Sequence, residues 1–348
     1  MRKHRCETSF IQQIQGKYMQ LGVLAGMGRD WQDSIEKVRI AESLGYSMVA
    51  TGEAWGPSSI PWMTLLATHT EKIQIATSIL NVFSRSPGAI AQEFASLEML
   101  SKGRMVCGIG SSGHRVIEHF HGVPFDRPLR RIREYVEIIK LLLEGQELNY
   151  DGKLMQMSRG FRLDYERQRD SVPIYIAAIT PKSIKQTGEI ADGIFPIHWP
   201  SQRFASLKED LRAGAMSANR ENLNLTVAPF TNVYVGDSED ESLWQAARQP
   251  LFHYINRMGD FYWNMLVSNG FEDDVLASRA AWQERNRDGA FSAISKEMVQ
   301  AIQVIGPPDT IAGQLEQRAS DGADVQLIPM PQGSLEDVER QLSFYLGV

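Results

Sequence analysis

A short segment of small residues follows an apolar run about one third of the way along the chain. Residues 104–113 read RMVCGIGSSG, so the apolar run is followed at once by glycines and serines, whose small side chains leave the backbone accessible. Its small and polar members are Gly108, Gly110, Ser111, Ser112 and Gly113. Glycines allow a ligand to approach the backbone, and serine hydroxyls with free N–H groups suit an anion. The segment therefore predicts a phosphate site, with a plain tight turn as the alternative.

The GxGxxG spacing of this segment is a weak signal for a dinucleotide. No acidic residue follows about 20 residues later at a predicted strand end, where a ribose would need one. A second candidate for phosphate contact is Ala177, Ala178 and Ile179, which precede Pro181 at the predicted start of a helix. Helix N-termini offer free N–H groups to anions. A tight strand-to-helix turn is the competing interpretation.

Two ionisable residues stand at predicted strand ends, where catalytic groups often lie. Glu53 lies in TGEAWG and His198 in FPIHWP, and His114 directly follows the glycine segment. We predict catalytic roles for Glu53 and His198. Glu53 could instead be a carboxylate at a helix N-terminus, and each histidine could be a packing or surface residue. No His and carboxylate set has metal-ligand spacing, so we expect no metal.

Aromatic side chains at the same predicted strand ends could form the walls of a substrate pocket. Trp55, Phe83 and Trp199 occupy such positions, and we add His114 to this predicted pocket. Aromatic rings at a pocket wall stack on ligand rings and exclude water.

The elements that must position these residues repeat a short apolar run and then an amphipathic stretch. We predict strands at 19–26, 46–54, 72–82, 104–110, 172–181, 193–200, 225–236 and 323–331. About eight strand–helix pairs are what a (β/α)8 TIM barrel needs, and its active site lies at the C-terminal ends of the strands. A doubly wound open sheet is the alternative fold.

Two segments depart from the repeat. Residues 148–170 alternate around Asp151 and Gly152, which predicts a β-hairpin excursion. Residues 240–305 are rich in aromatic side chains and predict a helical insertion that covers the barrel mouth or meets a partner. We expect one domain over 19–348, with residues 1–18 as an N-terminal extension.

Composition narrows the class of protein. The net charge is −6 and basic residues are not clustered, so nucleic acid is not an expected partner. Two cysteines cannot build a disulfide framework or a four-cysteine zinc site. The chain has neither the apolar core of a signal peptide nor about 18 consecutive apolar residues. We expect a cytoplasmic protein that does not enter a membrane.

Read together, the motifs resemble the luciferase-like flavin or deazaflavin oxidoreductases, and more closely the branch that uses coenzyme F-420. The resemblance covers nearly everything after residue 19. The stretches that carry it are TGEAWG, TSILNVFSRSPGAIAQEFASLEMLSKGR, GIGSSGHRVIEHFHGVPFDRPLRRIREYVEIIK, IYIAAITPKSIKQTGEIADGIFPIHW, FHYINRMGDFYWNMLVSNGFEDDV and VIGPPDTIAGQLEQ.

This resemblance implies a barrel with a tricyclic ring in its mouth and a phosphate tail held by loops. It also implies a non-prolyl cis peptide behind the ring, which here falls at Ser78–Ile79. Glu53 matches an acidic position near the reacting ring. Ala54 departs from the sugar-phosphate dehydrogenases of the superfamily, which have a histidine there. Alcohol oxidation by that histidine is therefore not expected.

The implied activity is hydride transfer between coenzyme F-420 and a small organic substrate. An FMN-dependent monooxygenase that uses reduced flavin and molecular oxygen is the first alternative, because a deazaflavin reacts poorly with oxygen. A non-catalytic ligand-binding barrel is the second. The superfamily commonly forms dimers through helices of the first half of the barrel, so we expect a homodimer.

Overall fold

Eight parallel strands form the centre of the molecule. The structure is a computed structural model that describes residues 19–220 and 224–348, so the predicted extension 1–18 lies outside the described residues. The strands follow one another round the sheet, and β4 (Leu80–Asn81) also pairs with β5. They are β1 (Leu21–Leu24), β2 (Met48–Thr51), β3 (Gln74–Thr77), β5 (Met105–Gly110), β8 (Ile174–Ile176), β9 (Gly193–Ile194), β10 (Thr226–Val227) and β13 (Gln326–Pro329).

The sheet closes on itself between β10 and β13. Beyond β10, Phe230 forms an isolated parallel bridge with Leu327. The Leu327 N–H donates to the Pro229 carbonyl at 2.9 Å, and the Thr231 N–H donates to the Leu327 carbonyl at 2.8 Å. The (β/α)8 barrel predicted from the sequence is confirmed, and the open doubly wound sheet is excluded.

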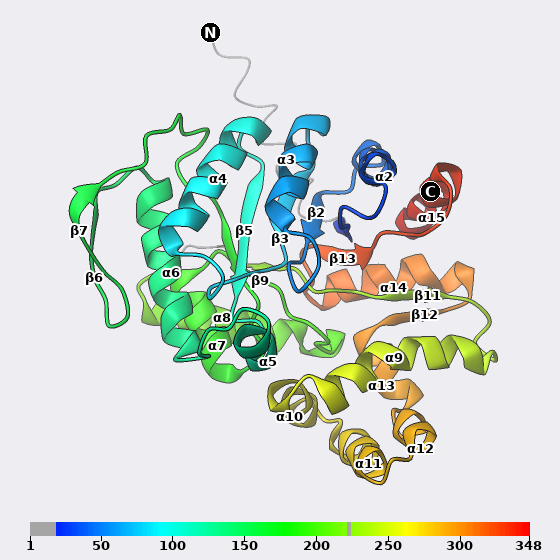
Figure 1. The fold of residues 1–348 in the computed structure, drawn as a ribbon. Helices are drawn as coiled ribbons and strands as arrows, with labels where there is room; N and C mark the ends of the chain where they lie inside the picture. Colours follow the sequence, from blue (N-terminus) through cyan, green and yellow to red (C-terminus); the bar gives the residue numbers. More distant parts are fainter. Residues whose placement is uncertain (1–18, 221–223) are drawn as a thin grey trace.

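Helices surround the barrel and follow its strands in the predicted order (Figure 1). Local signals explain several starts: the Asp30 carboxylate accepts from the N–H groups of Gln32 and Asp33, and Thr180 and Ser183 form a capping box. The surrounding helices are α2 (Trp31–Ser43), α3 (Ser59–His69), α4 (Pro87–Ser101), α6 (Pro128–Leu143), α7 (Pro181–Ile190), α8 (Phe204–Ser217), α14 (Pro308–Asp321) and α15 (Leu335–Leu346).

A compact apolar cluster fills the barrel interior. Val106, Phe195 and Leu327 are fully buried members of this cluster. Gly108 is required here, because a Cβ atom at this position would lie 1.7 Å from the Thr77 carbonyl oxygen. The first glycine of the GIGSSG segment is therefore a packing residue of the barrel.

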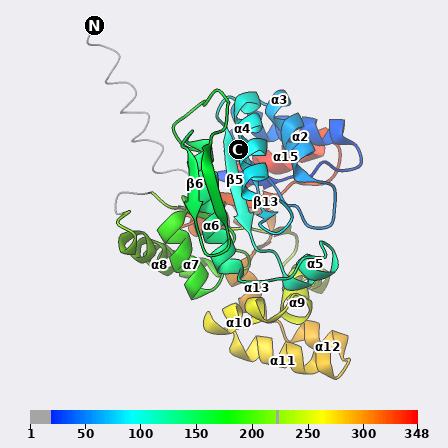
Figure 2. The same cartoon turned by 60° about the vertical axis from the view of Figure 1, so that its left-hand side comes forward.

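Both departures from the repeat are present. The predicted hairpin consists of β6 (Leu148–Asp151) and β7 (Gln156–Phe161), which pair antiparallel. The predicted insertion contains α9 (Glu241–Arg257), α10 (Asp260–Ser268), α11 (Glu272–Gln283), α12 (Arg287–Ser292) and α13 (Lys296–Ile302). Figure 2 shows α10, α11 and α12 as a lobe at one end of the barrel.

The strand predicted over 225–236 is wrong in one respect, because the structure divides it. Only β10 belongs to the barrel. The later part, β11 (Val233–Val235), pairs in parallel with β12 (Val304–Gly306), which follows the insertion. Pro229 lies between the two pieces, and the chain leaves the barrel after its bridge to β13. The 19–220 and 224–348 ranges contain no helix long and apolar enough to cross a membrane.

Candidate active site

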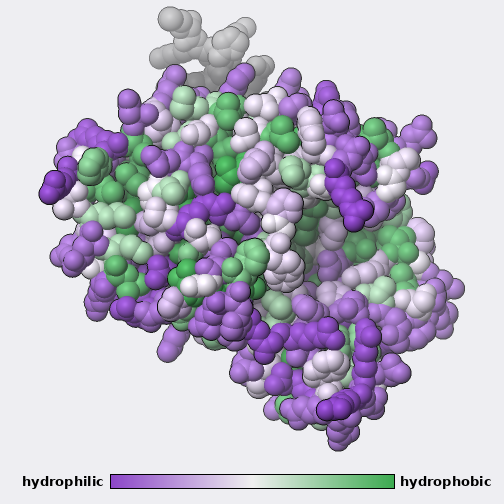
Figure 3. Space-filling model, viewed as in Figure 1, coloured by the Kyte–Doolittle hydropathy of each residue, from purple (hydrophilic) through white to green (hydrophobic). Residues whose placement is uncertain are grey.

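The C-terminal ends of the barrel strands face the helical insertion. The short helix α5 (His114–His119), which follows β5, lies at this end next to α9 and α10 (Figures 1 and 2). An Arg115 guanidinium N–H donates to the Arg257 carbonyl at 3.4 Å, so the β5 loop and the insertion touch. The surface is hollowed between the barrel and the insertion (Figure 3). The insertion therefore borders the barrel mouth.

Residues from three strands meet at the floor of this mouth. The peptide bond between Ser78 and Ile79 is cis, as the resemblance predicted. Gly110 lies against it: a Cβ atom at Gly110 would be 3.2 Å from Ile79 Cδ1 and 3.3 Å from Ala177 Cβ. The structure thus brings together three of the residues predicted to bind a cofactor.

Two loops at this floor carry unpaired backbone donors. Within the described ranges, the N–H groups of Ser111, Ser112 and Gly113 have no hydrogen-bond acceptor, and neither do those of Ala178 and Ile179. The loops are adjacent because β5 pairs with β8. Free N–H groups on adjacent loops can form an anion site. A phosphate-bearing cofactor with a planar ring fits the small residues and the free donors of this arrangement.

The Glu53 carboxylate is held by two residues, Ser59 and Arg85. It accepts from the Ser59 N–H at 2.8 Å at the start of α3, and an Arg85 guanidinium N–H donates to Oε2 at 3.1 Å. Burial raises the pKa of Glu53, but the hydrogen bonds from Arg85 and Ser59 outweigh it and hold the pKa below its usual value. Glu53 is therefore ionised at neutral pH, and its place at a helix N-terminus matches the alternative interpretation as well.

Arg85 connects Glu53 to a second carboxylate. Its Nε donates to Glu93 Oε1 at 3.1 Å, and Glu93 belongs to α4. Burial raises the pKa of Glu93, although Arg85 opposes this shift. The ion-pair network thus fixes the β2–α3 loop to the segment that follows β4.

His198 is buried at the C-terminal side of β9. Its side chain packs edge-on against Tyr254 of α9, with ring centroids 4.4 Å apart, and Tyr254 packs against Tyr262 of α10 at 4.6 Å. Nε2 of His198 is buried and has no partner among the described residues. The backbone φ is 52°, a conformation that is uncommon for residues other than glycine. Such a buried, unpaired nitrogen in an unusual backbone conformation is typical of functional sites.

The environment of His198 keeps its imidazole neutral. Burial lowers the pKa of His198 to about 4, and the nearby His253 adds to this shift. At neutral pH the ring therefore offers one N–H donor and one nitrogen acceptor. This is suited to orienting a polar ligand atom by hydrogen bonding.

The four predicted pocket residues differ in how far the structure buries them. Trp55 is 64% exposed, so it does not form a closed wall, whereas Phe83 and Trp199 are buried in the core. Phe83 stacks on Phe125 at 5.2 Å. His114 is exposed at the start of α5. A Cβ atom added at Gly259 would lie 3.8 Å from the Cε1 atom of His114. Pocket roles for these four residues stay predictions.

Sequence reasoning missed several residues at this end of the barrel. Arg85 lies inside the quoted stretch SRSPG, but nothing there identifies Glu53 as its partner. The guanidinium of Arg131 lies 4.7 Å from the Phe83 ring centroid, and its buried Nε lacks a partner among the described residues. Tyr254 belongs to the aromatic-rich segment 240–305, but nothing in the sequence identifies it as a neighbour of His198. The described residues contain no cluster of three or more His, Cys, Asp or Glu suited to a metal.

Comparison with known proteins identifies a family match over most of the chain. The family model described as luciferase-like monooxygenase matches residues 11–325. The match begins inside the predicted N-terminal extension and includes the barrel mouth and the insertion.

Curated relatives align over nearly their full lengths. A Mycobacterium tuberculosis protein that bears the name "putative coenzyme F420-dependent oxidoreductase" is 26% identical over 92% of this chain and 97% of its own. The 5,10-methylenetetrahydromethanopterin reductase of Archaeoglobus fulgidus is 25% identical over 85% of this chain and 89% of its own.

Among solved structures, the coenzyme F-420-dependent tetrahydromethanopterin reductase of Methanopyrus kandleri has a similar fold. The TM-score is 0.77 at 22% sequence identity, covering 94% of this chain and 96% of that one. This likeness supports the barrel assignment.

Proposed function

The chain belongs to the luciferase-like monooxygenase family, and on that premise we propose that it transfers a hydride between coenzyme F-420 and a small organic substrate. The family and its relatives make the chain an enzyme of the oxidoreductase class. The observation that carries the choice of cofactor is the near full-length alignment with the relative whose name reads "putative coenzyme F420-dependent oxidoreductase".

We assign the floor of the barrel mouth to the cofactor. When bound, the deazaflavin supplies the carbon that carries the hydride, so the protein contributes orientation, electrostatics and exclusion of water. The free N–H groups of the Ser111–Gly113 and Ala178–Ile179 loops would hold the phosphate. Gly110 and the Ser78–Ile79 peptide would lie beside the ring, where a larger residue would meet Ile79 and Ala177.

We assign the substrate side to His198. Its neutral imidazole would donate or accept one hydrogen bond with a polar atom of the substrate, and the packing of Tyr254 holds the ring in place. A group with a pKa of about 4 is almost entirely unprotonated at pH 7, so His198 orients the substrate and does not begin the reaction as an acid. Glu53 is ionised and engaged by Arg85, so we propose that it positions the loops around the ring.

The second candidate function is an FMN-dependent monooxygenase, which is favoured by the description of the matching family. The same floor could hold the phosphate of FMN. The two functions differ in the co-reactant, because the monooxygenase requires molecular oxygen.

A parallel titration of the purified protein with F-420 and FMN tests the proposal. The chain has seven tryptophans, so quenching of intrinsic fluorescence can report binding. We expect F-420 to bind at least about tenfold more tightly than FMN, which corresponds to about 1.4 kcal/mol. Tighter binding of FMN, together with oxygen consumption by reduced flavin that is faster with the protein than without it, would support the monooxygenase. Binding of neither would exclude both assignments.

A further inference from the structure

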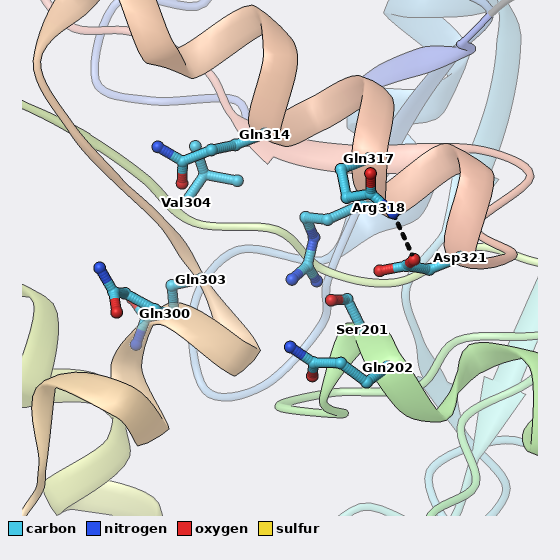
Figure 4. Close-up of a pocket in the computed structure, with 9 residues that line it drawn as sticks. All are labelled: Ser201, Gln202, Gln300, Gln303, Val304, Gln314, Gln317, Arg318 and Asp321. Carbon is cyan, nitrogen blue, oxygen red and sulfur yellow. Dashed lines mark hydrogen bonds between the residues drawn. The ribbon is translucent and has the colours of Figure 1, made fainter.

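A cavity of about 340 Å³ opens on the outer wall of the barrel, apart from the residues assigned to the mouth. It lies between the short 3-10 helix η1 (Ser201–Arg203), α13, β12 and α14. Its lining is mainly glutamine, with one arginine and one aspartate. Figure 4 shows the Arg318 guanidinium pointing into the space between Ser201, Gln202 and Gln300.

Arg318 is a buried cation without a paired anion. The residue is only 4% exposed, and no carboxylate of the described residues lies within salt-bridge distance of its guanidinium. Nη1 makes one long hydrogen bond, 3.4 Å, to the Ala301 carbonyl, and the guanidinium lies 5.3 Å from the Phe204 ring centroid. Nε and Nη2 have no partner among the described residues. Buried charges are normally paired, because removing an unpaired charge from water is strongly unfavourable.

The nearest acidic residue in the lining does not meet this need. Asp321 Oδ1 accepts from the Gln317 side chain at 2.8 Å, as Figure 4 also shows. Burial lowers the pKa of Arg318 to about 10, so the guanidinium is still charged at neutral pH. The cavity is therefore lined by a positively charged side chain whose Nε and Nη2 donors are buried and have no protein acceptor among the described residues.

A free acceptor lines the same cavity. Gln303 is 1% exposed and uses its Nε2 to donate to the Ala247 carbonyl at 2.8 Å. Its Oε1 is buried and has no partner among the described residues. A matching ligand would thus present an acceptor pair to Arg318 and a donor to Gln303.

We propose that this cavity binds a small monocarboxylate that also carries a hydroxyl or amine. A planar carboxylate matches the fork of the guanidinium, and the second group would donate to Gln303 Oε1. One arginine with an aspartate at the edge suits a single negative charge better than the two charges of a phosphate. Ser201 is three residues from His198, so the site and the barrel mouth share one short segment of chain.

Isothermal titration calorimetry at constant ionic strength tests the site with sodium lactate as the probe. Propionate is the matched probe without the hydroxyl, and phosphate tests the other anion class. We expect lactate to bind about fivefold more tightly than propionate, the effect of about one hydrogen bond. Phosphate binding more tightly than lactate, or no binding of lactate, would overturn the proposal.

Variants at Arg318 separate a ligand site from a structural role. Arg318→Lys keeps the charge but loses the fork, so lactate should bind at least about tenfold more weakly. Arg318→Met should abolish lactate binding and raise Tm in lactate-free buffer, because it removes an unpaired buried charge. Asp321→Asn should strengthen binding by removing a negative charge beside the site. Arg162→Met, at an exposed arginine directly after β7, is the control and should leave lactate binding unchanged.

Two results would contradict the assignment of Arg318. One is a wild-type affinity for lactate in Arg318→Met. The other is a lowered Tm of Arg318→Met with unchanged binding in Arg318→Lys, since that pair of results would make the guanidinium a structural group of the α14 packing.

Discussion

At the scale of single residues, burial of His198 at the barrel mouth makes the stability of the folded protein depend on pH. Its pKa is lowered from 6.5 to about 4 in the folded protein. The unfolded chain therefore binds more protons between these values, and the folded state loses stability as the pH falls through this window. By the linkage relation the loss is roughly 3 kcal/mol at pH 4 and below.

We expect the contribution of His198 to the free energy of unfolding to rise from pH 4 to pH 6.5 and then to level off. His198→Gln keeps a polar side chain that does not titrate, so its stability should vary less with pH over this range. Urea unfolding at several pH values measures both profiles. His69→Gln, which removes an exposed histidine at the end of α3, is the control. An equal pH dependence in His198→Gln and the wild type would contradict the burial of a neutral imidazole.

At the scale of elements, β5 contains two glycines with different tasks. The Cβ of an alanine at Gly108 would meet the Thr77 carbonyl oxygen at 1.7 Å, which no side-chain adjustment relieves. At Gly110 the nearest atoms are side-chain carbons at 3.2 and 3.3 Å, so small shifts can accommodate the change. One strand thus serves barrel packing at its middle and the mouth at its end.

We therefore expect Gly108→Ala to prevent folding or to lower Tm severely. Gly110→Ala should fold but bind F-420 at least about tenfold more weakly, because the added methyl group occupies the floor of the mouth. Gly313→Ala is the matched control, because an added Cβ atom there would meet no described atom within 4 Å beyond its chain neighbours and the backbone of its own helix. Circular dichroism gives Tm and the fluorescence titration gives affinity. A stable Gly108→Ala variant, or unchanged F-420 affinity in Gly110→Ala, would contradict this division of roles.

At the scale of the whole molecule, the predicted homodimer depends on what α4 leaves exposed. The apolar residues Ile90, Phe94 and Leu97 pack against the chain's own core. Met99 and Leu100 at the end of α4 are each 45% exposed. We predict a dimer that uses this end of α4.

Light scattering coupled to size exclusion checks the mass against the 39.2 kDa of one chain. A dimer should give twice this mass, and Met99→Lys should shift the population towards the monomer. Met216→Lys, at an exposed methionine of α8, should leave the mass unchanged. A monomeric wild type, or a dimer that both variants retain, would reject this interface.

The amino-acid sequence by itself determined the barrel and its order of elements. Apolar runs of four to six residues that alternate with amphipathic stretches can bury both faces only as parallel strands covered by helices. The hairpin and the helical insertion could also be predicted from the sequence, because turn residues and helical patterns are likewise local signals. The resemblance in short motifs also located the cis peptide at Ser78–Ile79.

Only the tertiary structure decided which of the candidate residues meet. Pairing of β5 with β8 places Gly110 against Ala177, and a contact between α9 and the β9 loop buries His198. The partnership of Glu53 with Arg85 spans 32 positions. This ion pair produces no periodic pattern in the sequence, because ion pairs between loops depend on distance in space and not on spacing along the chain. The division of 225–236 was hidden for a related reason: both halves are β-type sequence, and only the strand that each half pairs with separates them.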